Sequence, residues 1–260
     1  FPTRRSSDLQ WKNRYYTYRF VINPETIGSL AYLERHGTEL RENLLAGLVL
    51  TCLGGARKKL RLKRSRKDDA PFDELCSRLN SRSHSNSTSN GYSARGLRPI
   101  PTERFEPHSG SDERQYCSPG FNLPVSQMSR LVYGKYPEYH TSLDNKALMG
   151  IDAIIDSADQ IERLLHLMDK EIFYVNLKPS GEPKLGDLKL YPTLNFYFKQ
   201  ENQSKQTFEM QWFSAAIMNL LCWSDGSHSL KTIARRSRIA EKKLRYTADV
   251  LMEKGLLVRV

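Results

Sequence analysis

The sequence predicts an α/β domain, with a mainly parallel sheet flanked by helices, followed by a small winged helix-turn-helix domain. Two patterns carry this prediction. Strand-like and helical segments alternate up to residue 174, and short helical segments with a terminal apolar run fill residues 205–260. With 260 residues, of which 39% are apolar, the chain is long enough for one sizeable domain and one small one. We expect the α/β domain over residues 10–174, an extended linker or arm over 175–204, and the winged helix over 205–260.

The first segments alternate between strand and helix. Residues 15–22 are aromatic and β-branched and stop at an Asn-Pro pair, which indicates a strand that ends in a loop. A helix over about residues 26–35 should follow. Residues 44–53 are almost continuously apolar, as in a strand whose sheet is covered on both faces.

The rest of the expected α/β domain holds a loop, a strand and a long helix. Residues 77–92 are polar, rich in Ser and Asn and without a period, which indicates a surface loop or an insertion. A third strand over residues 123–128 precedes a loop rich in Tyr, Gly and Pro. Apolar residues recur at helical spacing from 146 to 172 and predict the helix that closes the domain.

The carboxy-terminal part changes in character. Residues 176–195 are interrupted by prolines and glycines, which is typical of an extended arm. Helices are then expected over residues 210–223, 229–236 and 240–254, with Ser229 as the N-cap of the second. The short apolar run at 256–258 predicts a strand, and this order of elements is that of a winged helix-turn-helix.

Most of the net charge of +11 comes from one short segment of the chain. Between Arg57 and Lys67 the sequence holds eight Lys and Arg residues and no acid, so this run supplies most of the net charge. No aromatic ladder accompanies it, and we expect a solvated loop or hairpin in preference to a nucleic-acid patch.

Cysteine spacing and hydropathy indicate the cellular compartment that we expect for the protein. The four cysteines are scattered without CxxC spacing, which favours a reducing compartment, the cytoplasm, over a disulfide framework or a zinc ribbon. No apolar stretch approaches the roughly 20 residues that span a bilayer, so we expect a soluble chain with no membrane partner.

The first nine residues form a separate feature. Residues 1–9 read like the in-frame translation of a common sequencing adapter, so we expect a foreign segment joined to the carboxy-terminal part of a longer protein. The alternative is an ordinary basic, Ser-rich tail.

Three loops at the ends of predicted strands carry candidate site residues, because ligands of open α/β sheets bind at such loops. Glu25 begins the helix after the first strand, where it is either a ligand or an acid that complements the helix dipole. Asp112 and Glu113 stand beside Arg114, as a site or as a surface ion-pair cluster. His140 lies among tyrosines before the closing helix. Carboxylates and a histidine from separate loops are ligands that zinc accepts at a catalytic site.

With these loops the sequence resembles the co-catalytic di-zinc aminopeptidases, the family of bacterial leucyl aminopeptidase and glutamate carboxypeptidase. It is most similar to a bacterial branch of aminopeptidase-like proteins that carry a carboxy-terminal winged helix and are often associated with polysaccharide biosynthesis. The phrases PETIGS at 24–29, GSDERQYCSPG at 110–120 and YPEYHTS at 136–142 carry the resemblance. It implies a zinc exopeptidase-like fold for residues 10–174.

The resemblance also implies roles for individual residues. Glu25 and His140 would share one zinc ion and Asp112 would hold a second, and a metal-activated water would attack a peptide or related amide bond beside a free amino terminus. Glu25 or Glu113 would act as general base. The family's first histidine and its bridging aspartate fall before residue 15, so we expect this chain to lack a complete site and to be inactive. The expected substrate-binding residues, which alternatively only pack locally, are Arg114, Tyr116 and Tyr139.

The winged helix offers a second function. Its basic residues lie around the turn between the second and third helices, and such a cluster neutralises phosphates in nucleic-acid complexes. The alternative, which we favour, is a solvated face on a packing or dimerisation module in a homo-oligomer. A non-catalytic regulatory protein that binds DNA or a partner through this module is therefore the second hypothesis. The cluster comprises Arg235, Arg236, Arg238, Lys242, Lys243 and Arg245.

Overall fold

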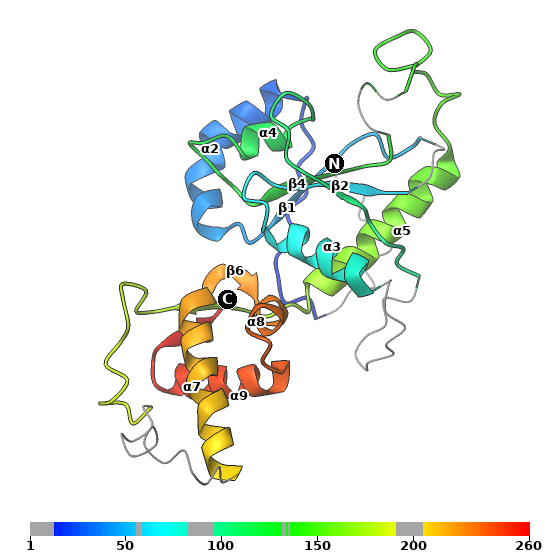
Figure 1. The fold of residues 1–260 in the computed structure, drawn as a ribbon. Helices are drawn as coiled ribbons and strands as arrows, with labels where there is room; N and C mark the ends of the chain where they lie inside the picture. Colours follow the sequence, from blue (N-terminus) through cyan, green and yellow to red (C-terminus); the bar gives the residue numbers. More distant parts are fainter. Residues whose placement is uncertain (1–12, 56–58, 83–95, 132–133, 135, 191–204) are drawn as a thin grey trace. The chain divides into compact units, whose positions relative to one another are not determined.

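The structure, a computed structural model, describes residues 13–55, 59–82, 96–131, 134, 136–190 and 205–260. The expected adapter segment at 1–9 lies outside these ranges. The chain divides into two compact units between Lys170 and Glu171, whereas the sequence places the end of the α/β domain after residue 174. Each unit is described by itself (Figure 1).

The first unit contains a four-stranded mixed sheet in the order β1-β4-β2-β3. The strands are β1 (Gly47–Leu50), β2 (Arg61–Lys63), β3 (Thr102–Glu103) and β4 (Val125–Ser129). β1 runs parallel to β4, but β2 pairs with β4 antiparallel, with Leu62 opposite Met128. The sheet is therefore mixed: two of its three strand pairs are parallel, as expected, and the antiparallel pair is formed by β2, a strand within the basic run that was not expected.

Helices cover both faces of this sheet. They are α2 (Ile27–Asn43), α3 (Pro71–Arg82), α4 (Glu113–Tyr116) and α5 (Ile151–Met168). Side chains alternate along β4: Val125 packs with Leu33 of α2, whereas the hydroxyl of Ser126 donates to Asp73 of α3. Figure 1 accordingly shows α2 with α4 and α3 with α5 on opposite sides of the strands.

Several expectations for the first unit are confirmed. β1 lies within the expected range 44–53, β4 covers most of the expected range 123–128 and ends one residue beyond it, and helices begin at Ile27 and Ile151, inside the ranges expected for them. The first helix is longer than expected, since α2 continues to Asn43, and α5 is shorter at both ends.

Residues 15–22 do not form the expected strand. Within the described ranges they are assigned to no strand, Tyr15 and Tyr16 lie in a bend, and Phe20 and Ile22 are exposed. The backbone N–H groups of Tyr15 and Tyr16 donate to the Asp169 carboxylate instead, at 3.1–3.2 Å. This attachment to the end of α5 replaces sheet pairing.

The expected loop at 77–92 and the expected loop or hairpin in the basic run are both wrong in part. Helix α3 continues to Arg82, and the rest of the expected loop, residues 83–92, lies outside the described residues. Within the basic run Leu60 and Leu62 are buried, which allows Arg61–Lys63 to form an inner strand of the sheet.

The second unit confirms the winged-helix expectation. Its helices are α7 (Lys205–Trp223), α8 (Leu230–Ser237) and α9 (Glu241–Glu253). Its sheet, β6-β5-β7, contains β5 (Phe173–Asn176), β6 (Asp225–Ser229) and β7 (Leu257–Arg259). The Ser229 hydroxyl accepts a hydrogen bond from Thr232 N at 3.3 Å and caps α8 as expected.

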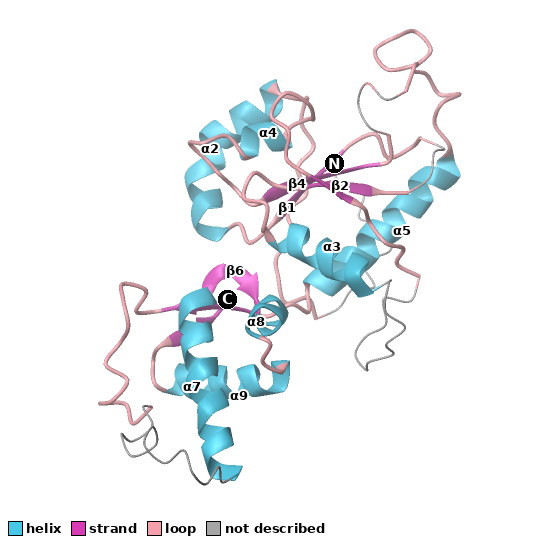
Figure 2. Cartoon of the chain, viewed as in Figure 1, coloured by secondary structure: helices cyan, strands magenta, loops and turns pink. Residues whose placement is uncertain are grey.

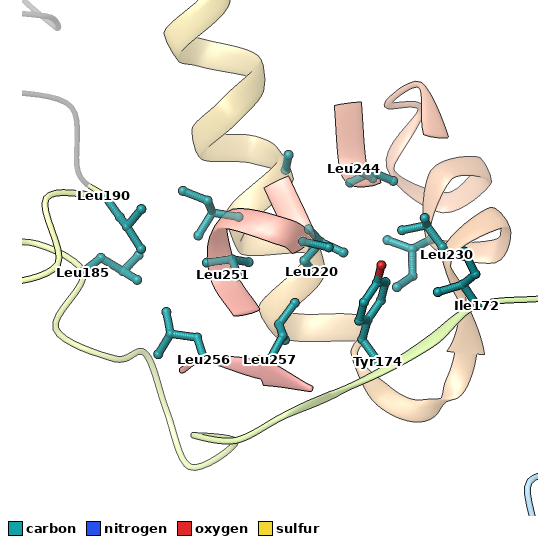
Figure 3. Packing of buried hydrophobic residues seen from close by; sticks show 14 residues of the cluster. Ile172, Tyr174, Leu185, Leu190, Leu220, Leu230, Leu244, Leu251, Leu256 and Leu257 are labelled. Carbon is teal, nitrogen blue, oxygen red and sulfur yellow. The ribbon is translucent and has the colours of Figure 1, made fainter. Parts of the chain in front are cut away.

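An apolar core holds the second unit together (Figure 3). Leu220 of α7, Leu230 of α8 and Leu251 of α9 are almost fully buried in it. Leu185 and Leu190, from the segment expected as an extended arm, are buried in the same core. This segment therefore packs on the winged helix. Among the described residues, every helix is too short or too polar to cross a bilayer.

Candidate functional site

Two of the three candidate loops meet at the start of α2. The Ser111 hydroxyl donates to the Glu25 carboxylate at 2.5 Å, and the Asp112 carboxylate accepts a hydrogen bond from Thr26 N at 2.7 Å. Each of these bonds joins residues that are 86 positions apart in the chain. Asp112 precedes the short helix α4 but makes no side-chain cap for it. Its carboxylate is directed to the loop that carries Glu25.

The backbone around Glu25 is fixed by local contacts. Thr26 adopts a positive φ of 60°, and Gly28 N donates to Pro24 O at 3.0 Å. A Cβ atom at Gly28 would lie 2.7 Å from the Asn23 side chain and 2.8 Å from Pro24, so only glycine fits this turn without rearrangement. The turn leaves Glu25 exposed, with its Oε1 atom held by Ser111.

Glu113 is in a different environment from Glu25. Its side chain is completely buried, and Lys63 Nζ lies 2.8 Å from Oε1. Oε2 accepts a hydrogen bond from Ser111 N at 2.9 Å. Both carboxylate oxygens are occupied by protein donors, and this favours an anchoring role over the proton-accepting role considered from the sequence.

The expected substrate-binding residues lie around the same two loops. Arg114 Nε donates to Ser111 O at 3.2 Å, so Ser111 contacts both Glu25 and Arg114. Burial raises the pKa of Tyr116, although a hydrogen bond from Ser29 of α2 opposes the shift. Burial also raises the pKa of Tyr139, and the nearby Cys52 and Glu25 raise it further.

His140 is exposed and adopts a φ of 57°. Its ring stacks on Tyr139, with 3.9 Å between the ring centroids. It lies in a series of turns between β4 and α5, drawn as a loop in Figure 2. Among the residues that the structure describes, no three His, Cys, Asp or Glu side chains gather as metal ligands. The loops of Glu25 and Asp112 are joined by hydrogen bonds, whereas in the described part of the chain no such bond joins His140 to either of them.

Some neighbours of the site were not predicted from the sequence. Cys52 follows β1 with a φ of 47°, and burial together with the nearby Cys52 raises the pKa of Tyr136. Lys63 was counted as part of a solvated run, yet its side chain is only 11% exposed. The alternation of Leu60 and Leu62 with basic residues is the signal that predicts a strand there.

The basic residues of the winged helix are divided between local contacts and solvent. The Arg236 guanidinium lies 4.5 Å from the Trp223 ring centroid, and Lys243 Nζ lies 4.5 Å from that of Trp212. Arg245 pairs with Glu241 at 3.0 Å but stays half exposed. The basic side chains exposed at the end of α8 and on the first half of α9 are Arg235, Arg236, Arg238, Lys242 and Arg245.

Comparisons with known proteins agree with the division of the chain into two units near residue 171. The family model of a domain of unknown function, DUF4910, matches residues 4–171, and a winged helix-turn-helix model matches residues 172–259. A putative polysaccharide biosynthesis protein with aminopeptidase-like domain from Clostridium acetobutylicum is 35% identical over 257 residues, which are 99% of this chain and 52% of that protein.

A solved structure is similar as well. The crystal structure of a putative peptidase from Clostridium acetobutylicum matches with a TM-score of 0.54 and 32% identity, over 97% of this chain and 50% of that one. The chain therefore spans about half the length of the relatives it matches.

Proposed function

Because this chain belongs to the DUF4910 family and is similar to a protein with an aminopeptidase-like domain, we propose that it forms part of an aminopeptidase-like hydrolase. The substrate is a peptide or related amide with a free amino group next to the bond that is cleaved. One observation carries the proposal: hydrogen bonds through Ser111 and Thr26 bring the Glu25 and Asp112 carboxylates to one edge of the fold.

The proposed residues act by proton transfer and orientation. Glu25 is exposed and anchored at one oxygen, which leaves its other oxygen for one of two roles, as a zinc ligand or as the acceptor of a proton from an attacking water. Arg114 and Tyr139 would orient the substrate carbonyl, and Tyr116 would line the pocket from α4. Glu113 stabilises this arrangement from below the surface and takes no part in the proton transfer.

We also propose that the longer protein, of which this chain would form part, binds zinc. Carboxylate oxygens and an imidazole are suitable ligands, and bound zinc would lower the pKa of a water and polarise the carbonyl. The described residues contain no group of three ligand side chains, so they do not fit a zinc ion by themselves. We propose that Glu25, Asp112 and His140 supply part of a two-zinc site whose other ligands come from outside the described residues. This chain alone then binds zinc weakly and has no peptidase activity.

Zinc content tests the proposal. We expect the longer clostridial relative to purify with near-stoichiometric zinc by mass spectrometry of the metal, and this chain to retain far less. Alanine at the relative's positions aligned with Glu25 and Asp112 should lower its zinc content and its hydrolysis of aminoacyl anilides. Alanine at the position aligned with Glu34, an exposed acid of α2, is the matched control. A zinc-free but folded relative would contradict the enzyme proposal, and turnover by this chain alone would contradict its inactivity.

The free cysteines bear on the proposed location. In the described part of the chain all four, Cys52, Cys76, Cys117 and Cys222, are unbridged. Unbridged cysteines persist in a reducing compartment, which supports the proposal that the protein acts in the cytoplasm.

A second function is supported by the exposed basic side chains of α8 and α9. Lys242 and Arg245 lie in the first half of α9, the helix that enters the major groove in helix-turn-helix proteins. If the module binds a duplex, the affinity for random DNA should fall steeply as salt rises, and Lys242→Ala with Arg238→Ala should weaken it. Lys184→Ala, at an exposed lysine outside the helices, is the control. Binding that is absent or insensitive to salt would exclude this function.

A further inference from the structure

We propose that Lys63 is a positioning residue for the candidate site, acting through the buried Glu113 to hold Asp112 and Ser111 against the Glu25 loop. The proposal rests on the proposed function for the importance of that site. Its evidence is the set of contacts that connects the inner strand β2 with the start of α2.

The Lys63 ammonium group is surrounded by acceptors from one loop. Nζ lies 2.8 Å from Glu113 Oε1 and 2.7 Å from Glu106 O, and it also donates to Ser109 O. The same group lies 5.0 Å from the Phe105 ring centroid. A lysine has three N–H donors, and here all three have protein acceptors. The strand thereby binds the loop of residues 105–113 at several points.

Glu113 connects Lys63 with the candidate site, because its two carboxylate oxygens contact different partners. While Oε1 contacts Lys63, Oε2 accepts a hydrogen bond from Ser111 N at 2.9 Å. The chain bends sharply between these points at Gly110, whose φ is 140°. A Cβ atom at Gly110 would lie 1.9 Å from Glu113 Oε1, so the loop can close over the ion pair only with glycine at this position.

Beyond Ser111 the connection reaches the other loop. The Ser111 hydroxyl donates to Glu25, and Asp112 accepts from Thr26 N. Lys63 itself contacts neither Glu25 nor Thr26 through any hydrogen bond described here, so its effect is indirect. Removing the ammonium group would leave Glu113 charged and buried without its partner, which is strongly unfavourable. We expect the loop to open so that water reaches Glu113, and Asp112 to move away from Thr26.

The Thr26 amide is a direct reporter of this movement, because its N–H is the donor to Asp112. In Lys63→Met we expect amide hydrogen exchange at Thr26, measured by NMR, to become about tenfold faster or more. The amide of Leu251 in α9, in the other unit, should keep its exchange rate, and that of Val49 in β1 should rise by no more than the lower urea midpoint accounts for. Lys67→Met removes an exposed lysine of the same basic run and should change none of these rates.

The double variant Lys63→Met/Glu113→Leu separates positioning from general stability. It buries no charge, so it should recover most of the urea midpoint lost in Lys63→Met. It also removes the acceptor of Ser111 N, and Thr26 should therefore still exchange fast. Unchanged Thr26 exchange in either folded variant would overturn the proposal. Failure of both variants to fold would overturn it too, because it would show a global structural role. None of these results depends on zinc or activity, so the proposed function can fail independently.

Discussion

The two units of the chain are stabilised by different kinds of buried group. In the first unit buried charges join the elements: Asp73 connects β2, α3 and β4, and Glu113 connects β2 with the site loop. In the second unit an aliphatic core joins three helices and a sheet, and the basic side chains of α8 and α9 lie at the surface. Glu171 of the second unit also pairs with Lys231, at 2.9 Å, but the buried cluster of that unit is mainly aliphatic. The first unit therefore depends more on buried charges with specific partners, and the second more on shape and volume.

This difference explains why the candidate site belongs to the first unit. A carboxylate keeps a defined position only where donors hold it, and Glu25 and Asp112 each have one such donor from the neighbouring loop. In the second unit the charges of α8 and α9 contact tryptophan faces, a neighbouring charge on the same helix, or solvent. Such contacts constrain position less, and a surface of this kind suits binding better than catalysis.

The largest expected effect is in the first unit. The Asp73 carboxylate is fully buried and accepts hydrogen bonds from Ser65 N, Ser65 Oγ, Ala70 N and Ser126 Oγ, at 2.6–3.2 Å. Asp73→Ala would leave these donors unpaired in the interior, and we expect a loss of about 4 kcal/mol in the free energy of unfolding of this unit. Urea unfolding followed by amide exchange in β4 measures it.

The control for this prediction is Asp68→Ala, because Asp68 is 59% exposed and its side-chain ion pair is with the nearby Arg64. A change below about 1 kcal/mol is expected there. If Asp73→Ala lowered the free energy of unfolding as little as Asp68→Ala does, the buried charge would not stabilise the first unit. The proposed difference between the two units would then be wrong.

The second unit should respond to lost volume. Leu220 is completely buried among Leu230, Leu251 and other core residues. Leu220→Ala should lower the free energy of unfolding of this unit by about 3 kcal/mol, since it removes apolar contacts and leaves a cavity. Met218→Ala, on the same helix but 41% exposed, should lower it by less than about 1 kcal/mol. Amide exchange in α9 measures both, and equal effects of the two changes would show that the core is not tightly packed.

The second unit was also the part that the sequence predicted best. Its helices are local structures whose ends are marked by recognisable residues, such as the N-cap Ser229. Its core residues follow from the helical periodicity of apolar residues. Two elements were missed, β5 and β6: Phe173–Asn176 directly follows the expected closing helix, and Asp225–Ser229 lies where two helices were expected to meet. The two strands pair with each other, and β5 also pairs with β7. Strand pairing of this kind depends on residues far apart in the chain, which local patterns do not contain.

In the first unit the sequence identified the loops of the candidate site but not what holds them. Glu25 and Asp112 were singled out from their places after strands, and the structure brings them together. Lys63 was missed because a dense basic run indicates a solvated surface, although Leu60 and Leu62 alternate with basic residues there; the structure adds the pairing of Lys63 with a buried acid on this inner strand. Residues 15–22 failed as a strand for the converse reason: their composition suits a sheet, but their hydrogen-bond partner is Asp169.

The smallest expected effect concerns the charged pair in the second unit. Burial would raise the pKa of Asp225, but hydrogen bonds from His228 and Ser227 outweigh it and hold the pKa well below its ordinary value near 3.8. A lowered folded pKa adds stability above the ordinary value, and this stability is lost as the pH falls below it. The side chain is half exposed, so solvent screening limits the contribution to below about 1 kcal/mol. Urea midpoints at pH 5 and pH 3 should therefore differ slightly more in the wild type than in Asp225→Asn, with the exposed Asp249→Asn as control. A larger pH dependence in Asp225→Asn than in the wild type would show that the pair does not stabilise the unit, and that its core alone does.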